Sequence, residues 1–145
     1  MTARRPRLVG INHVALAVDE LGEALAFWRR LFDFEADLSE PGIAFIDVGD
    51  QFIALAEEGA SEAEPHFGLV VDDREATRGA LEAAGAEIQP GRRLNARDPF
   101  GNLIQVVQYD QVQFTKSPEI LRAMALELTK TADALEELRA KGVDV

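Results

Sequence analysis

His13–Glu20 reads HVALAVDE, and His66–Asp73 reads HFGLVVDD. The two stretches align without a gap at an offset of 66 − 13 = 53, and they share histidine, leucine, valine and aspartate. The run from Leu8 to Val18 is rich in β-forming residues, and its end alternates in side-chain direction. Such self-similarity indicates one supersecondary unit that is used twice, because a single unit cannot cover its own sheet.

The residues after each stretch predict a helix and then three short strands. In the first copy the helix is marked by apolar residues at three- and four-residue spacing, namely Leu21, Leu25, Trp28 and Phe32. We expect this stripe to pack on the face of Val14, Leu16 and Val18. Strands are predicted near residues 35–38, 43–48 and 51–57, and in the second copy near 86–90, 93–96 and 102–108, after a helix over 74–84 that ends at Gly85.

The predicted fold class is α+β, with two tandem βαβββ modules that form a curled, partly open, barrel-like sheet around a cavity. We expect a single domain over residues 1–145, with module one at 8–58 and module two at 64–110, separated by a polar linker over 59–65. A helical extension over 117–142 follows. Its first helix begins at Ser117-Pro118 with the stripe Ile120, Leu121, Met124 and Leu128, and its second runs from about Thr131 to Lys141.

The composition excludes several classes of protein. The chain has 145 residues, 47% of them hydrophobic, no cysteine and a formal net charge of −11. A surface this acidic repels the phosphate backbone, so we expect no nucleic-acid partner. No apolar run approaches the roughly 18 residues that a membrane span needs, and the basic Met1–Arg7 stretch lacks the apolar segment of a signal peptide. We therefore predict a cytoplasmic protein without a membrane partner.

The two histidines of the chain, His13 and His66, occupy matching positions in the two modules. Both lie on a strand face with small neighbours, Ala15, Ala17 and Gly68, which suits a cavity better than a packed core. Two imidazoles brought together by a repeat are natural ligands for a first-row divalent ion. The alternative is that each histidine is an ordinary hydrogen-bonded core residue.

Together with DPFGNLIQVVQ at 98–108, the two repeats resemble the vicinal oxygen chelate superfamily, which includes glyoxalase I, methylmalonyl-CoA epimerase, fosfomycin- and bleomycin-resistance proteins and extradiol dioxygenases. The resemblance covers about residues 8–109. It implies that each module curls into a half-barrel and that metal ligands come from the first and last strands. By position, His13, His66 and Gln105 match those ligands. The position in module one that corresponds to Gln105 is Ala54.

Two departures from that pattern bear on the reaction. Many members carry glutamate where this chain has Gln105, whose neutral amide oxygen is a poorer donor to a cation and cannot act as a general base. Ala54 likewise offers no base, so proton abstraction of the glyoxalase I or epimerase kind is disfavoured. A metal-dependent dioxygenase or lyase remains, using Fe, Mn, Zn or Ni. Tyr109 is a candidate donor, or a half-buried residue at a strand end.

The expected cavity-lining residues are Phe45, Asp47, Phe52, Ala54, Leu103 and Val107. We expect an enzyme that acts on a small oxygen-chelating substrate, and a homodimer. The competing hypothesis is a non-catalytic protein of the bleomycin-resistance type that sequesters a small molecule. A third is a structural or interaction role of the helical tail. The sequence leaves open whether the two modules pair within one chain or between two subunits.

Overall fold

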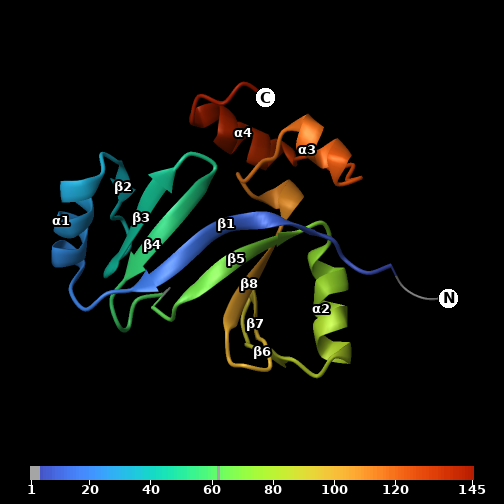
Figure 1. Cartoon of the computed structure of the whole chain (residues 1–145), viewed down its shortest axis with the longest axis horizontal. Helices are drawn as coiled ribbons and strands as arrows, with labels where there is room; N and C mark the ends of the chain where they lie inside the picture. The colour runs from blue at the N-terminus through green and yellow to red at the C-terminus, as the bar shows by residue number, and fades with distance from the viewer. Residues whose placement is uncertain (1–3, 62) are drawn as a thin grey trace.

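The computed structural model describes residues 4–61 and 63–145, so the start of the basic N-terminal stretch and Glu62 of the predicted linker lie outside the described residues. An open eight-stranded sheet forms the body, in the order β2-β3-β4-β1-β5-β8-β7-β6 (Figure 1). The α+β class is as predicted. The strands are β1 (Leu8–Ala17), β2 (Ala36–Asp37), β3 (Ile43–Val48), β4 (Gln51–Ala56), β5 (His66–Val71), β6 (Glu87–Ile88), β7 (Leu94–Arg97) and β8 (Leu103–Gln108).

The two modules have the same strand order. From the centre of the sheet outward, module one runs β1, β4, β3, β2 and module two runs β5, β8, β7, β6. β1 pairs with β4 in parallel, and β5 pairs with β8 in the same way. The two halves meet where β1 runs antiparallel to β5. The modules therefore pair within one chain in this structure.

Helices α1 (Leu21–Leu31) and α2 (Arg74–Ala83) lie on one face of the sheet, each beside its own module (Figure 1). Their N-termini are capped by the matching acidic residues of the repeat, Glu20 and Asp73, whose carboxylates accept backbone N–H groups. We call the opposite face, which carries His13, His66 and Gln105, the inner face.

The expected packing of α1 is wrong in part. The helix packs with Val18 on β3 and β4, against Ala44, Ile46 and Leu55. Val14 and Leu16 remain 41% and 39% exposed on the outer side of β1, because α1 lies over the neighbouring strands instead.

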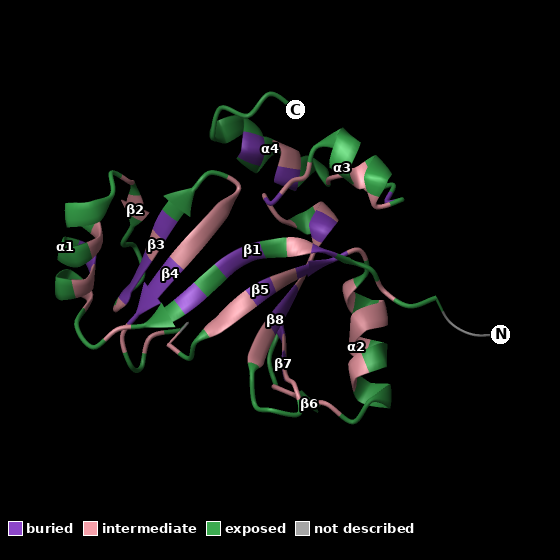
Figure 2. Cartoon of the chain, in the orientation of Figure 1, coloured by how far each residue is buried: buried purple, intermediate pink, exposed green. Residues whose placement is uncertain are grey.

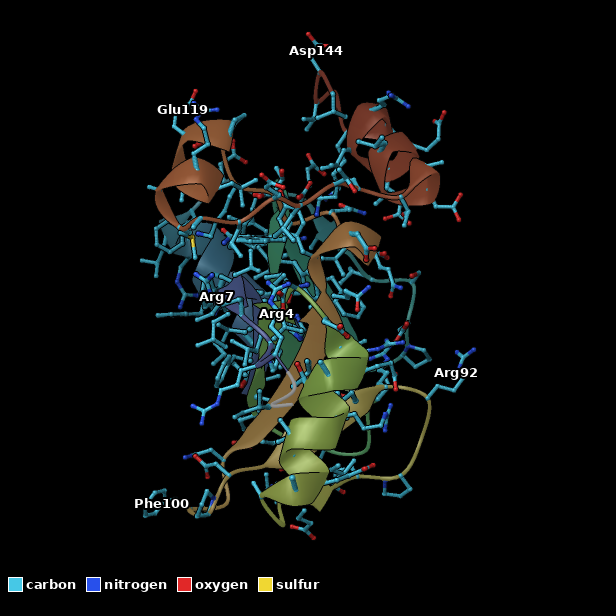
Figure 3. All side chains as sticks on the ribbon, turned by 90° about the vertical axis from the view of Figure 1, so that its right-hand side faces the viewer. Arg4, Arg7, Arg92, Phe100, Glu119 and Asp144 are labelled. Atoms are coloured by element: carbon cyan, nitrogen blue, oxygen red, sulfur yellow. The ribbon has the colours of Figure 1, made fainter. Side chains whose placement is uncertain are left out.

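The C-terminal extension covers one end of the sheet (Figures 1 and 3). It consists of a short 3-10 turn η1 (Tyr109–Gln111), α3 (Pro118–Ala123) and α4 (Ala132–Ala140). The first predicted helix is shorter than its stripe, since Ala125 takes a left-handed conformation (φ 57°) and Leu128 lies beyond the helix. Phe114 lies directly over Gly10, where an added Cβ would be 2.5 Å from the ring.

Buried residues follow the centre of the sheet and its contact with the extension (Figure 2). The extension joins the sheet through a cluster of Val9, Val70, Tyr109, Phe114 and Leu126. Within the described residues, no helix is both long enough and apolar enough to cross a bilayer.

Candidate functional site

The two histidines meet across the seam between the modules. In the β1–β5 register, His13 lies opposite Gly68 and Ala15 lies opposite His66, so the histidines are diagonal neighbours on one face. Their Nε2 atoms are 3.2 Å apart, and the rings meet nearly edge to face at 83°. Matching positions in the repeat thus become adjacent in space.

A bulge and a glycine set the position of His13. The register shifts between Ile11 and His13, so the extra residue Asn12 turns inward beside it, and both side chains are at least nine-tenths buried. They lie over Gly68, where an added Cβ would be 2.1 Å from Asn12 Oδ1 and 2.2 Å from His13 Nδ1. Phe52 covers the other side of His13, with the rings stacked at 4.5 Å.

Hydrogen bonds orient both imidazoles. His13 Nδ1–H donates to Asn12 Oδ1 (2.8 Å), and His66 Nδ1–H donates to the Glu64 carbonyl (2.7 Å). When each Nδ1 carries the proton, each Nε2 presents a lone pair, and two lone pairs then face each other. A cation between them, or one further proton shared by the pair, would stabilise this arrangement.

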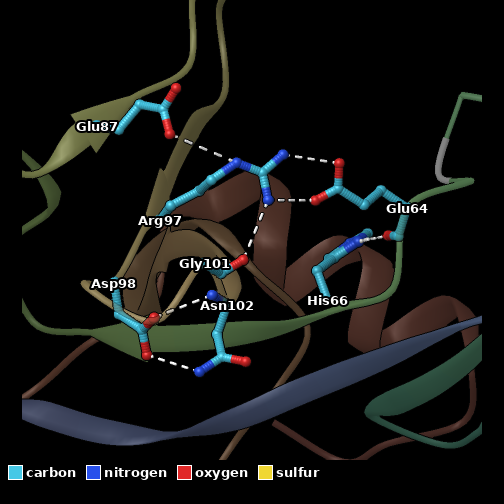
Figure 4. Close-up of polar contacts among 7 residues, drawn as sticks. All are labelled: Glu64, His66, Glu87, Arg97, Asp98, Gly101 and Asn102. Carbon is cyan, nitrogen blue, oxygen red and sulfur yellow. Dashed lines mark hydrogen bonds and ion pairs between the residues drawn. The ribbon is translucent and has the colours of Figure 1, made fainter.

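Glu64, whose carbonyl orients His66, is itself held by a bidentate ion pair with Arg97 (Figure 4). Arg97 on β7 donates to both carboxylate oxygens of Glu64 (2.5 and 2.7 Å) and to the carbonyl of Gly101 (3.2 Å). Hydrogen bonding from Arg97 holds the pKa of Glu64 below its ordinary value, and the same bond raises the pKa of Arg97. Through this ion pair, β7 holds Glu64 in place, and the Glu64 carbonyl in turn favours the His66 tautomer with a proton on Nδ1.

Two amide side chains continue the row of His13 across the inner face. Gln105 lies opposite Gly68 on one side and opposite Asn95 on the other. Gln105 is only 9% exposed, and its amide makes no hydrogen bond to the described residues. The Asn95 Oδ1 atom is buried without a hydrogen-bond partner. These oxygens are available to a ligand near the histidines.

The expected cavity-lining residues divide into three groups. Phe45, Asp47 and Phe52 line a cavity of about 590 Å³ next to His13. Leu103 lines two smaller cavities beside His66, of about 450 and 300 Å³. Ala54 is fully buried between Ala15 and Phe45, and Val107 packs on the cluster below the C-terminal extension, so neither lines these cavities.

Tyr109 lies apart from the histidine pair, at the start of η1. It is 3% exposed, and its hydroxyl forms hydrogen bonds with Thr115 Oγ1 (3.1 Å) and with the Lys116 backbone N–H, which donates to it (3.3 Å). Lys130 Nζ lies 3.5 Å from the centre of its ring. These contacts give Tyr109 a structural explanation as an anchor of the extension.

The residues present fit a divalent ion in part. Two imidazole nitrogens that share one ion at about 2.0–2.1 Å are separated by roughly 2.8–3.4 Å for bond angles between about 90° and 109°, and the observed 3.2 Å lies in this range. A proton shared by the two rings fits equally well. Within the described chain, no three histidine, cysteine, aspartate or glutamate side chains converge as a metal-binding group. The remaining ligands would be Gln105 and substrate.

Sequence reasoning missed Asn12, Asn95, Glu64 and Arg97. The bulge that turns Asn12 inward has no signature in the alternation of the strand. Asn95 could have been found from its place one residue inside a predicted strand that neighbours Gln105. Arg97 and Glu64 are 33 residues apart, and only the fold brings them together.

Two βαβββ modules joined side by side, with a histidine pair and cavities on their shared inner face, define the vicinal oxygen chelate class of fold. The sequence matches the family model of the Glyoxalase/Bleomycin resistance protein/Dioxygenase superfamily over residues 10–106. The chain belongs to this superfamily, and the resemblance seen in the sequence is confirmed. No curated protein matches the sequence.

Solved structures agree on the fold. A Mn(II)-bound glyoxalase from Novosphingobium aromaticivorans is 21% identical with a TM-score of 0.57, over 71% of this chain and 40% of that one. A methylmalonyl-CoA epimerase variant from Streptomyces coelicolor, in complex with 2-nitronate-propionyl-CoA, is 20% identical with a TM-score of 0.51, over 70% and 98%. A fusion of a xylose isomerase-like TIM barrel with 4-hydroxyphenylpyruvate dioxygenase is 25% identical with a TM-score of 0.57, over 72% and 20%. The chain thus spans less than half of the first and third proteins.

Proposed function

We propose that this protein is a metal-dependent enzyme that acts on a small oxygen-chelating substrate, with His13, His66 and Gln105 as the protein ligands of a divalent ion. One observation carries the proposal. The two Nε2 atoms face each other at 3.2 Å, while an acceptor fixes each Nδ1. A histidine that serves as a metal ligand has this arrangement, in which one nitrogen donates to an oxygen and the other is left to bind.

When bound, a divalent ion would supply Lewis acidity or an oxygen-binding centre, and adjacent oxygens of the substrate would complete its coordination. Gln105 would contribute a neutral amide oxygen, so the protein ligands would leave the full charge of the ion to stabilise negative charge on the substrate. Fe, Mn, Zn and Ni all suit two imidazoles and an oxygen donor. A Mn(II)-bound glyoxalase among the similar structures supports a divalent metal in the superfamily.

The chain's own residues favour a dioxygenase or lyase reaction over a glyoxalase I or epimerase reaction. Those two reactions need a base that removes a proton next to a carbonyl, and neither Ala54 nor Gln105 has a titratable group. The buried oxygen of Asn95 and the amide of Gln105 can instead hold and orient a polar substrate beside the histidines.

Metal analysis of the purified protein tests the proposal. The protein is prepared without added metal, dialysed against each of the four ions, and assayed for bound metal by elemental analysis. We expect close to one ion per chain in the wild type, and at least a tenfold loss of affinity in His13→Ala and in His66→Ala. Circular dichroism confirms that the variants are folded. Bound metal that is substoichiometric and unchanged by both substitutions would refute the proposal.

The second candidate is a metal-free protein that sequesters a small molecule. The missing carboxylates at Ala54 and Gln105 favour it, since a protein that only binds its ligand can lose both without consequence. In that case the histidine pair shares a proton and acts as a polar wall of the binding site. The same metal analysis separates the two, because the sequestering protein holds no stoichiometric metal that depends on His13 and His66.

A further inference from the structure

One cavity lies outside the histidine pair, between module one and the C-terminal extension. It has a volume of about 590 Å³ and is bounded by β3 and β4 on one side and by α4 and the segment after η1 on the other. This volume is in the range of small-molecule binding sites. It adjoins His13 through two residues that line it, Asn12 and Phe52.

The charged side chains on its wall are mostly acidic. The cavity has five carboxylates and one ammonium group: Glu35, Asp37, Asp47, Asp50, Glu137 and Lys141. Lys141 Nζ already contacts Asp47 Oδ1 (3.3 Å) and donates to the carbonyl of Gly49 (2.7 Å). The wall therefore has a formal charge of 1 − 5 = −4, and its one ammonium group, on Lys141, already contacts Asp47 and Gly49.

Hydrogen bonds hold several of these carboxylates in place by one oxygen only. Asp50 Oδ2 accepts the backbone N–H of Thr115 (2.9 Å), and Glu137 Oε2 accepts the amide N–H of Gln113 (3.2 Å). The second oxygen of each takes no hydrogen bond from the described residues. Acceptors that are already oriented lose little entropy when a donor arrives, so they suit a ligand with several N–H groups.

Two further features indicate a ligand. Asn12 is 8% exposed, its Oδ1 is engaged by His13, and its amide nitrogen has no hydrogen-bond partner among the described residues although it borders the cavity. This donor is open toward the cavity and can serve an acceptor on a ligand. The rings of Phe45 and Phe52, edge to face at 5.6 Å, form an apolar wall beside it.

We propose that this cavity binds a small organic cation, in which a primary ammonium or guanidinium group is carried on a flat, apolar body. The carboxylates receive the cationic end, the phenylalanine rings pack against the body, and the Asn12 amide donates to an oxygen of the ligand. Several carboxylates around one cationic group add their attractions, and an aromatic face beside them also favours a cation. The proposal does not depend on a metal at the histidine pair.

Tyramine and tyrosol test the charge requirement, because they share one phenol ring and differ in having an ammonium or a hydroxyl at the same place. Binding of each is measured by calorimetry with EDTA-treated protein at low ionic strength. We expect tyramine to bind at least about tenfold more tightly than tyrosol, the effect of one ion pair of roughly 1.4 kcal/mol. Equal affinity for the two, or no binding of tyramine at millimolar concentration, would overturn the proposal.

Two triple variants of equal charge locate the binding. Glu35→Gln/Asp47→Asn/Glu137→Gln alters the cavity, and Asp19→Asn/Asp133→Asn/Glu136→Gln removes the same charge from exposed positions that do not line it. We expect the preference for tyramine to disappear in the first variant and to persist in the second. An equal loss in both would show a general effect of net charge and would reject the cavity as the site. Failure of the metal analysis leaves these measurements unaffected.

Discussion

Replacing Gly68 by alanine adds a single methyl group at the most crowded point of the histidine pair. The new Cβ would lie 2.1 Å from Asn12 Oδ1, 2.2 Å from His13 Nδ1 and 2.3 Å from His13 Cε1. Ordinary contacts of this kind are above about 3.4 Å, so both side chains must move by more than 1 Å. Both are buried, and Phe52 blocks His13 from behind.

Overpacking of this kind costs about 1–3 kcal/mol, which corresponds to a fall in Tm of roughly 3 °C for each kcal/mol in a chain of this size. Gly79→Ala is the matched control, because Gly79 is an exposed residue of α2 and an added Cβ meets nothing within 4 Å. There the same change should stabilise the protein by about 0.5–1 kcal/mol through helix propensity. The two substitutions are thus expected to have opposite signs.

Urea denaturation gives both free energies, and long-range ¹H–¹⁵N spectra of the imidazoles report on the site. The chain has two histidines, so the spectra contain two imidazoles. In Gly68→Ala we expect His13 to lose its single Nδ1–H tautomer while His66 keeps its own. If the variant has wild-type stability and an unchanged His13 signal, the close approach at Gly68 does not position the histidine, and the account of the site is wrong.

Three other substitutions test the contacts around the site. Arg97→Met removes the ion pair to Glu64, so we expect a mixture of His66 tautomers and a 10- to 100-fold loss of metal affinity. Because the pKa of Glu64 is held below 4.5, this pair stabilises the native state above that pH. The stability difference between wild type and Arg97→Met should therefore shrink as the pH falls through the lowered pKa, and a constant difference would contradict it. Lys130→Met leaves three carbonyls of the extension without the Nζ donor and should cost about 1–3 kcal/mol in urea denaturation. Val14 and Leu16 are exposed apolar residues on the outer side of β1, so we expect this side to form the interface of the homodimer. Val14→Glu should then give a monomer in light scattering, and a dimeric variant or a monomeric wild type would contradict this.

The repeat was the strongest source of prediction. The predicted strands over 43–48 and 51–57 match β3 to the residue and β4 to within one residue. The repeat also placed the histidines at equivalent positions, which become neighbours once β1 and β5 pair. Local sequence was sufficient here because strand, turn and repeat signals all agreed.

Interactions between distant segments could not be predicted in the same way. Helix α1 packs on β3 and β4 and not on β1, so the exposure of Val14 and Leu16 was missed. One wall of the cavity next to His13 comes from α4 and the residue after it, and the sequence of module one does not indicate that this segment packs there. The shortened α3 shows a similar limit, since its apolar stripe continues to Leu128 after the backbone has left the helix at Ala125.

The hydrogen bond from His66 to Glu64 makes the connection between the modules part of the site. Surface linkers normally accept inserted residues at little cost. Here the tolerance should end at Glu64, whose carboxylate is fixed to β7 and whose carbonyl orients the imidazole. Residues added before Glu64 leave this anchor intact, whereas one residue added between Glu64 and His66 separates the histidine from its anchor. Natural length variation in this loop should therefore lie before Glu64.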